Sequence, residues 1–183
     1  MKRAIFSVYD KKNIVFLAKE LKKMNWEIIA TQGTGKVLKK AKIDFVPIEK
    51  INKIGEIFGG KLKTISPQIE GGLLLDRENE KEKKEAEKLK IFPIDMVVCN
   101  FYPLPKIDIG GPCMVRAGAK NYKFVTVVVD PKDYQMIIKL LKEKNEIPLQ
   151  IRLKLAKKAF LKTSQYDRKI FNFLTKNEKK RTS

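Results

Sequence analysis

The strongest constraint on the fold is a regular alternation of short β-branched or aromatic runs with segments of helical period. Strands that are separated by helices favour a parallel sheet with helices packed on its faces. The runs at 95–100 and 124–130 are apolar enough to be buried on both faces, as strands inside such a sheet are. The sequence therefore predicts an α/β domain with a mainly parallel sheet, with strands at 4–8, 26–30, 43–48, 95–100 and 124–130 and helices at 13–24, 35–41 and 78–90.

The length of 183 residues suits one domain, 1–183, with a core large enough to need no disulfide or metal. We expect an α/β core over 1–146 and a C-terminal part over 147–176, whose pattern predicts two helices. Residues 177–183 are polar and predict a frayed tail. A packed stripe of the C-terminal part is expected to contain Ile151, Leu155, Ala159 and Phe160.

The charge balance points to an anionic partner. Forty Lys and Arg residues against 21 Asp and Glu give a formal charge of +19, which suits a nucleic acid, an acidic membrane or a phosphorylated metabolite. The lysines are scattered over helices and no nucleic-acid recognition motif is present, so we expect no specific nucleic-acid partner.

The sequence also bears on the compartment. No apolar run approaches the roughly 20 residues of a membrane span, and the N-terminal apolar stretch is too short for a signal peptide. Cys99 and Cys113 fit neither a disulfide framework nor zinc spacing. We therefore expect a cytoplasmic protein that does not enter a membrane.

The chain contains no histidine, so any acid-base chemistry must use Lys, Tyr, Asp, Glu or Cys. In an open parallel sheet, ligands bind beyond the carboxyl ends of the strands, and the segments that follow the strands are where such residues matter. After the first strand come Ser7 and Lys11, with Asp10 as a candidate helix N-cap.

The segment "ATQGTGK" follows the second strand and runs into a helix. Hydroxyl groups, glycine-exposed N–H groups and a helix dipole together make a phosphate cradle, for which Thr31, Gly33 and Thr34 are the candidates. An ordinary strand-to-helix turn is an equally good interpretation of this segment alone.

Polar groups also follow the fourth strand. Asn100 and Tyr102 offer an amide and a phenol, and Asp108 in "IDIGG" could accept a proton where glycines allow close approach of a ligand. Turn, cap and packing roles explain the same residues equally well. Arg116 and Lys120 share a face of the next helix, where most such pairs are simply solvated.

The stretch "FGGKLKTISPQIEGGLL", at 58–74, sets Lys61 and Lys63 beside paired glycines. In a chain this basic, two solvated surface lysines are the simplest interpretation. What favours a site is convergence, because separate segments at one edge of the sheet all supply phosphate-binding or proton-transferring groups.

The motifs "SVYDK", "ATQGTGKVL", "GGKLKTISP", "CNFYP", "IDIGG", "VRAGAKN" and "LAKKAFLKTSQYD" occur in order over nearly the whole chain. In this they resemble the IMP cyclohydrolase domain of bifunctional purine-biosynthesis enzymes. The resemblance implies a three-layer α/β/α, methylglyoxal-synthase-like fold. It also implies closure of the purine ring of 5-formamidoimidazole-4-carboxamide ribonucleotide (FAICAR) to give IMP and water, without a metal or redox cofactor.

The resemblance further implies partners and residue roles. The formyl-transferring half of those enzymes is not seen in this sequence, so a separate formylating enzyme is expected to supply the substrate, and a homodimer is suggested. Lys63 would lie near the formyl oxygen, Asp108 paired with Lys120 would manage the amide proton, and Tyr102 would assist proton transfer. Substrate-binding roles fall to Ser7, Lys11, Thr31, Gly33, Thr34, Lys61, Thr64, Asn100, Ile109, Gly110, Gly111 and Arg116.

Some positions depart from the family's pattern. Tyr9 replaces a usual serine, Gln32 a usual glycine, and Ser66 the histidine of the usual K-T-L-H-P. The connection from Tyr102 to Asp108 is short, where the family generally has a longer helical excursion.

Three other interpretations stay open. A regulatory module of the same fold would bind a nucleotide without catalysis and would not need the four predicted catalytic residues together. A methylglyoxal synthase would share the phosphate loop, but the absence of histidine and the "CNFYP" and "IDIGG" motifs count against it. A basic nucleic-acid-binding protein would explain the charge alone.

Overall fold

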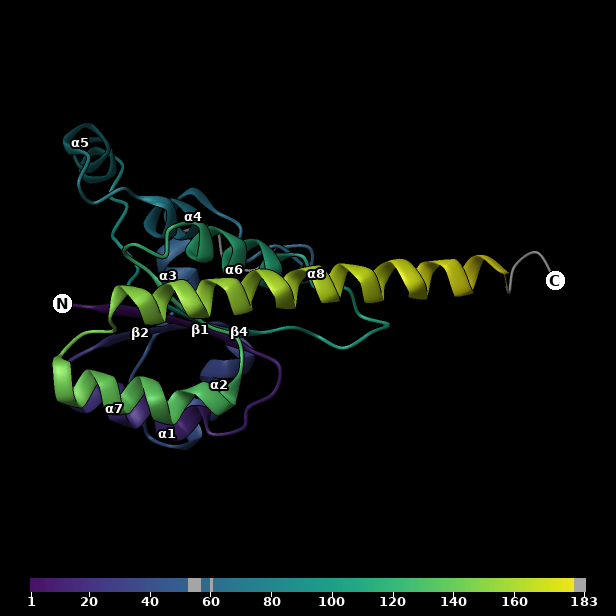
Figure 1. The fold of residues 1–183 in the computed structure, drawn as a ribbon, viewed down its shortest axis with the longest axis horizontal. Helices are drawn as coiled ribbons and strands as arrows, with labels where there is room; N and C mark the ends of the chain where they lie inside the picture. Colours follow the sequence, from purple (N-terminus) through teal and green to yellow (C-terminus); the bar gives the residue numbers. More distant parts are fainter. Residues whose placement is uncertain (53–56, 60, 180–183) are drawn as a thin grey trace.

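The computed structural model describes residues 1–52, 57–59 and 61–179. Its centre is a five-stranded parallel sheet with the order β3-β2-β1-β4-β5, so the predicted mainly parallel sheet is confirmed (Figure 1). The strands are β1 (Arg3–Val8), β2 (Glu27–Ala30), β3 (Val46–Pro47), β4 (Met96–Asn100) and β5 (Thr126–Val128).

Two layers of helices cover the sheet, which confirms the predicted three-layer arrangement. In Figure 1, α1 (Ile14–Lys23), α2 (Gln32–Lys40) and α7 (Tyr134–Lys144) lie on one face. The other face carries α3 (Ile48–Asn52), α4 (Pro67–Leu74), α6 (Gly110–Lys120) and α8 (Leu149–Lys179), while α5 (Glu80–Lys88) lies further out.

Side-chain alternation along β1 explains the two layers. Successive residues of a strand point to opposite faces, so Phe6 joins the core beneath α1 and α7, and Ile5 joins the core beneath α4 and α6. Val97 and Val98 of β4 divide in the same way, and both are fully buried. The middle residues of β1 and β4 are therefore apolar on both faces of the sheet, as the sequence predicts for 95–100.

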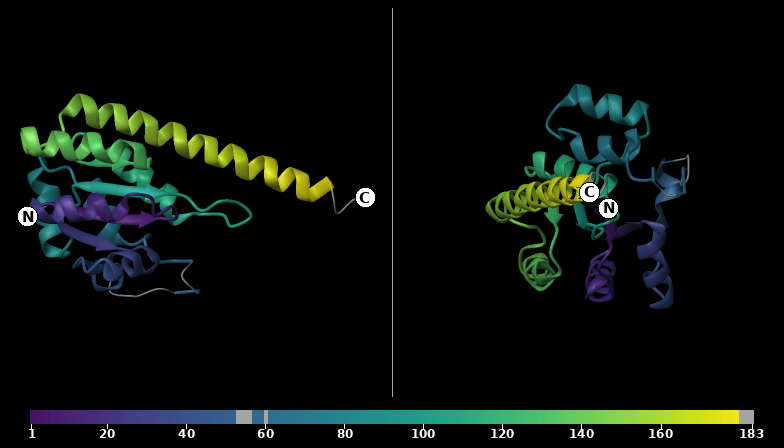
Figure 2. Two further views of the ribbon diagram at one scale, coloured as in Figure 1. Left: turned by 90° about the horizontal axis from the view of Figure 1, so that it is seen from below. Right: turned by 90° about the vertical axis from the view of Figure 1, so that its right-hand side faces the viewer.

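The C-terminal part is one helix, so the prediction of two helices over 147–176 is wrong. Helix α8 runs unbroken through Thr163, whose hydroxyl donates to the Phe160 carbonyl one turn earlier (2.9 Å). Of the expected packed stripe, Leu155 and Ala159 are buried, whereas Phe160 is 39% exposed. Figure 2 shows that the C-terminal half of α8 extends beyond the body of the domain.

The other differences from the sequence prediction are local. The third strand is two residues long and lies at the sheet edge, where Pro47, which has no N–H to donate, is tolerated. Within 58–74, the residues from Pro67 form α4, because the Ser66 hydroxyl accepts from the Ile69 N–H as an N-cap (3.3 Å) and proline suits the first helical turn.

Strand order decides where a ligand can bind. From β1 the chain builds outward through β2 and β3 on one side and through β4 and β5 on the other. At such a reversal the connections leave the sheet in opposite directions, and a crevice opens beyond the carboxyl ends of β1 and β4. No helix among the described residues has the length and apolar character needed to cross a membrane.

Candidate active site

A cavity of about 290 Å³ lies beyond the carboxyl ends of β1 and β4. Its lining brings together most of the predicted residues, namely Ser7, Lys61, Lys63, Thr64, Tyr102, Asp108, Ile109, Gly110 and Gly111. Gly59, Lys106 and Ile107, which the sequence analysis did not single out, complete the lining. The other predicted residues, all described, lie outside it: Lys11, Thr31, Gly33, Thr34, Asn100, Arg116 and Lys120.

Asp108 is the best-supported acid-base group of this cavity. Its Oδ1 accepts from the Gly111 N–H (2.8 Å) and its Oδ2 from the Tyr102 N–H (3.4 Å). A Cβ on Gly111 would lie 2.7 Å from Oδ2, so glycine is required for this approach. Burial raises the pKa of Asp108, against the opposing effects of those N–H groups and of two nearby lysines. A carboxylate with a raised pKa is a better base for an amide proton.

Those two lysines are Lys63 and Lys106. Both act electrostatically on Asp108, and Lys106 Nζ also lies over the Tyr102 ring, 4.4 Å from its centroid. The Lys63 carbonyl accepts from the Asn52 side-chain amide (2.8 Å), which anchors the backbone of Lys63 to α3. The cavity thus places two cations around one half-buried carboxylate.

Lys120 is not the partner of Asp108 within one chain. It is exposed in the last turn of α6, whereas Asp108 precedes the first turn. The ten steps from Gly110 to Lys120 in α6 correspond to about 15 Å along the axis, at about 1.5 Å per residue. The predicted pairing is therefore not made within one chain. Arg116 is directed elsewhere as well, since its guanidinium lies over the Phe160 ring of α8 at 5.6 Å.

The predicted phosphate cradle is the first turn of α2 rather than a loop before it. Thr31 occupies the N-cap position, and the helix begins at Gln32. A Cβ on Gly33 would meet nothing within 4 Å, so this turn faces open space. Thr34 differs from the prediction, because its hydroxyl is fully buried and bonded to the Val8 backbone, with its Oγ1 accepting from the N–H at 3.1 Å.

Lys11 lies between this turn and the cavity. Its Nζ donates to the Val8 carbonyl, and its pKa is lowered by burial and by Lys63, with Asp10 opposing. Lys63 and Lys11 therefore act on each other electrostatically. They form one cationic region, in which a phosphate or a developing oxyanion would be stabilised.

Asp10 is not a helix cap, because α1 begins at Ile14 and Asp10 instead accepts from the Lys12 N–H (2.9 Å). Asn100 fixes the same loop. Its Oδ1 accepts from the N–H groups of Tyr9 (2.7 Å) and Asp10 (2.8 Å), and its Nδ2 donates to the Asp10 carbonyl (3.0 Å). Asn100 therefore joins the ends of β1 and β4, which is the turn-forming alternative considered for it.

Together, a helix N-terminus, a cationic region and a half-buried carboxylate at the crevice of a parallel sheet form a site suited to an anionic ligand in an α/β domain. Residues 13–128 match the family model "MGS-like domain", and residues 118–183 match "AICARFT/IMPCHase bienzyme". The chain belongs to the MGS-like domain family, and the resemblance to the IMP cyclohydrolase part of the bienzymes is confirmed.

The relatives agree with this assignment. The bifunctional purine biosynthesis protein PurH of Persephonella marina is 46% identical over 97% of this chain, and that of Caldicellulosiruptor saccharolyticus is 43% identical over 94%. These matches cover 37% and 36% of the relatives, so the chain spans just over a third of their length. The crystal structure of ForH superposes with a TM-score of 0.84 at 35% identity, over 91% of this chain and 95% of that one.

Proposed function

We propose that the chain is an IMP cyclohydrolase, which closes FAICAR to IMP with loss of water in the last step of purine-ring synthesis. The observation that carries the proposal is the convergence of Lys63, Tyr102 and Asp108 on one cavity beside a helix N-terminus. The similarity to the bifunctional PurH proteins supports it.

The first chemical step joins the carboxamide nitrogen to the formyl carbon. An amide nitrogen is a poor nucleophile, so it must lose a proton as the bond forms, and Asp108 is placed to accept it. The π electrons of the formyl group move to its oxygen, where Lys63 and Lys106 stabilise the negative charge and a proton completes a hydroxyl group.

The second step expels water. The bond from carbon to the new hydroxyl breaks while the former formamido nitrogen releases its proton, and a C=N bond closes the aromatic ring. The Tyr102 phenol lines the cavity beneath Lys106, where it can relay a proton to the departing hydroxide. The overall balance is FAICAR to IMP plus one water, with no electron transfer.

The substrate phosphate is proposed to bind at the first turn of α2, near Lys11. Free N–H groups and the helix dipole favour an anion there, and Gly33 leaves the approach open. Lys61, exposed at the mouth of the cavity, adds positive charge. The buried Thr34 hydroxyl holds this turn against the Val8 backbone and is not proposed to contact the phosphate.

The test is an ultraviolet assay of the purified chain with FAICAR, without folate, metal or nicotinamide. Appearance of IMP absorbance at a rate proportional to protein concentration is the expected result. IMP binding without turnover by a folded protein would favour the regulatory module instead. The homodimer, the cytoplasmic location and supply of FAICAR by a separate formylating enzyme stay predictions, and sedimentation measures the first of them.

A further inference from the structure

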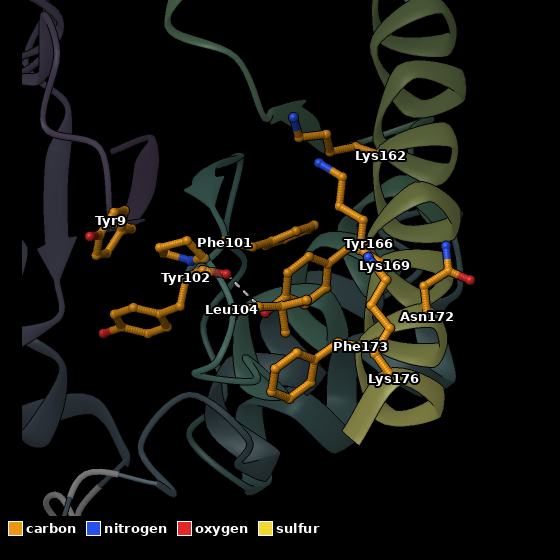
Figure 3. Close-up of a pocket in the computed structure, with 11 residues that line it drawn as sticks. Tyr9, Phe101, Tyr102, Leu104, Lys162, Tyr166, Lys169, Asn172, Phe173 and Lys176 are labelled. Atoms are coloured by element: carbon orange, nitrogen blue, oxygen red, sulfur yellow. Dashed lines mark hydrogen bonds between the residues drawn. The ribbon is translucent and has the colours of Figure 1, made fainter. Parts of the chain in front are cut away.

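One tyrosine outside the predicted site holds the two ends of the connection between β4 and α6. The Tyr166 hydroxyl, on α8, accepts from the Asp108 N–H (2.9 Å) and donates to the Tyr102 carbonyl (2.9 Å). The Lys106 carbonyl lies further away, at 3.4 Å, and competes for the same proton. Figure 3 shows the Tyr166 ring projecting from α8, with the bond to Tyr102 drawn as a dashed line.

The position of Tyr166 is fixed by packing. The side chain is 7% exposed, and its ring lies 5.0 Å from that of Phe101 in a tilted arrangement. A buried phenol normally requires partners for its hydroxyl, and here both partners belong to the segment that carries Tyr102 and Asp108. The Tyr166 hydroxyl therefore connects the long helix to the segment that carries Tyr102 and Asp108.

The bonds of Tyr166 are made to backbone atoms, so they constrain where the Tyr102 and Asp108 side chains begin. The direct contact between these residues, from the Tyr102 N–H to the Asp108 carboxylate, is long at 3.4 Å. The shared hydroxyl thus makes shorter bonds to both residues than they make to each other. Without it, the connection would keep its anchors at β4 and α6 and the long Tyr102–Asp108 bond, but would lose the two shorter bonds that link its ends.

We propose that Tyr166 is a positioning residue for the cyclisation, whose hydroxyl fixes the Tyr102–Asp108 segment in the geometry that turnover requires. This rests on the proposed function. Misplacement of a reacting group by about 1 Å costs up to roughly 100-fold in rate. The phosphate-binding turn of α2 is not in contact with this hydroxyl, so substrate binding should change less than turnover.

The experiment compares Tyr166→Phe with Tyr122→Phe, a matched loss of a hydroxyl at the other end of α6. Tyr166→Phe keeps the ring that packs on Phe101 and is expected to fold. We expect kcat to fall roughly 10- to 100-fold with KM within about twofold of wild type, and Tyr122→Phe to behave as wild type. Unchanged kcat in Tyr166→Phe would overturn the proposal.

Amide hydrogen exchange followed by NMR gives a second readout that needs no activity. The Asp108 amide should be protected in the wild type and should exchange at least about tenfold faster in Tyr166→Phe, while amides of β1 and β4 keep their rates. An unprotected Asp108 amide in the wild type, or an unchanged exchange rate of that amide in Tyr166→Phe, would contradict the proposed role of the Tyr166 hydroxyl. If the wild type made no IMP while these exchange rates behaved as expected, the cyclohydrolase proposal would fail and the structural role of Tyr166 would stand.

Discussion

Replacing Asp108 with asparagine should separate catalysis from stability. The variant keeps the shape of the side chain and an acceptor for the Gly111 N–H, but its NH₂ group would face the Tyr102 N–H and could not accept from it. It also lacks the base for the amide proton. General-base catalysis contributes typically 10²- to 10⁴-fold, so we expect kcat to fall by at least about 10².

The free energy of unfolding of this variant should not fall as kcat does. The pKa of Asp108 is raised in the folded state, mainly by burial, so its ionised form destabilises the fold at neutral pH. Each unit by which that pKa is raised corresponds to about 1.4 kcal/mol. For a domain of this size, about 1 kcal/mol shifts the Tm by about 2–4 °C. After allowance for the weakened bond to Tyr102, Asp108→Asn should have a Tm at pH 7 that is equal to or higher than that of wild type.

The pH dependence supplies the control. Below the unfolded pKa of about 3.9, the wild-type carboxyl is protonated in both states, so any advantage of the asparagine variant should disappear as the pH falls toward that value. The acid limb of the wild-type kcat/KM profile should lie above about pH 3.9 for the same reason. Scanning calorimetry from pH 4 to pH 8 and the ultraviolet assay measure both effects. A variant with turnover within about threefold of wild type would refute the role of Asp108 as base, and one that is several degrees less stable at neutral pH would refute the argument from burial.

Three further substitutions test the remaining parts of the site. Lys63→Ala should lower kcat by about 10² or more, as loss of an oxyanion donor does, with little change in KM; an effect confined to KM would assign Lys63 to binding. Lys106→Ala should lower kcat by roughly tenfold, while the matched Lys39→Ala, exposed in the last turn of α2, should not; equal effects would mean that only net charge matters. Gly33→Ala should raise the Tm slightly, because the new methyl group meets no protein atom within 4 Å and alanine favours a helix, yet weaken IMP binding in calorimetry if the phosphate approaches this turn. Unchanged IMP affinity would show that the phosphate does not bind at the first turn of α2.

Much of the fold could be predicted because short β-branched or aromatic runs form the strands and segments of helical period separate them. Apolar side chains of β4 and β5 lie on both faces, as in strands inside a sheet that is covered on both sides. A helix between two strands is the usual connection between parallel strands. The break expected within α8 was wrong because no proline or glycine interrupts 149–179, and a threonine alone can bond back to its own helix.

The site was partly predictable for a similar reason. Tyr102 follows the end of β4 and Asp108 precedes the glycines that open α6, and these positions in the chain lie at the crevice. The pairing of Lys120 with Asp108 was implied by the family resemblance, and the rise of about 1.5 Å per residue along α6 separates the two residues within one chain. Lys106 and Tyr166 were missed as site residues. The unusually short connection was a signal for Lys106, whereas the Tyr166 hydroxyl reaches Asp108 across 58 positions of sequence, a contact that no local pattern encodes.

The arrangement around Tyr166 bears on how this domain can change during evolution. One hydroxyl bonds to both ends of the segment between residues 102 and 108, so that segment is a loop whose ends are held together. Residues could be inserted or deleted within this loop without shifting the strand before it or the helix after it. The two bonds of this hydroxyl would let natural selection lengthen or trim the segment while Tyr102 and Asp108 keep their positions.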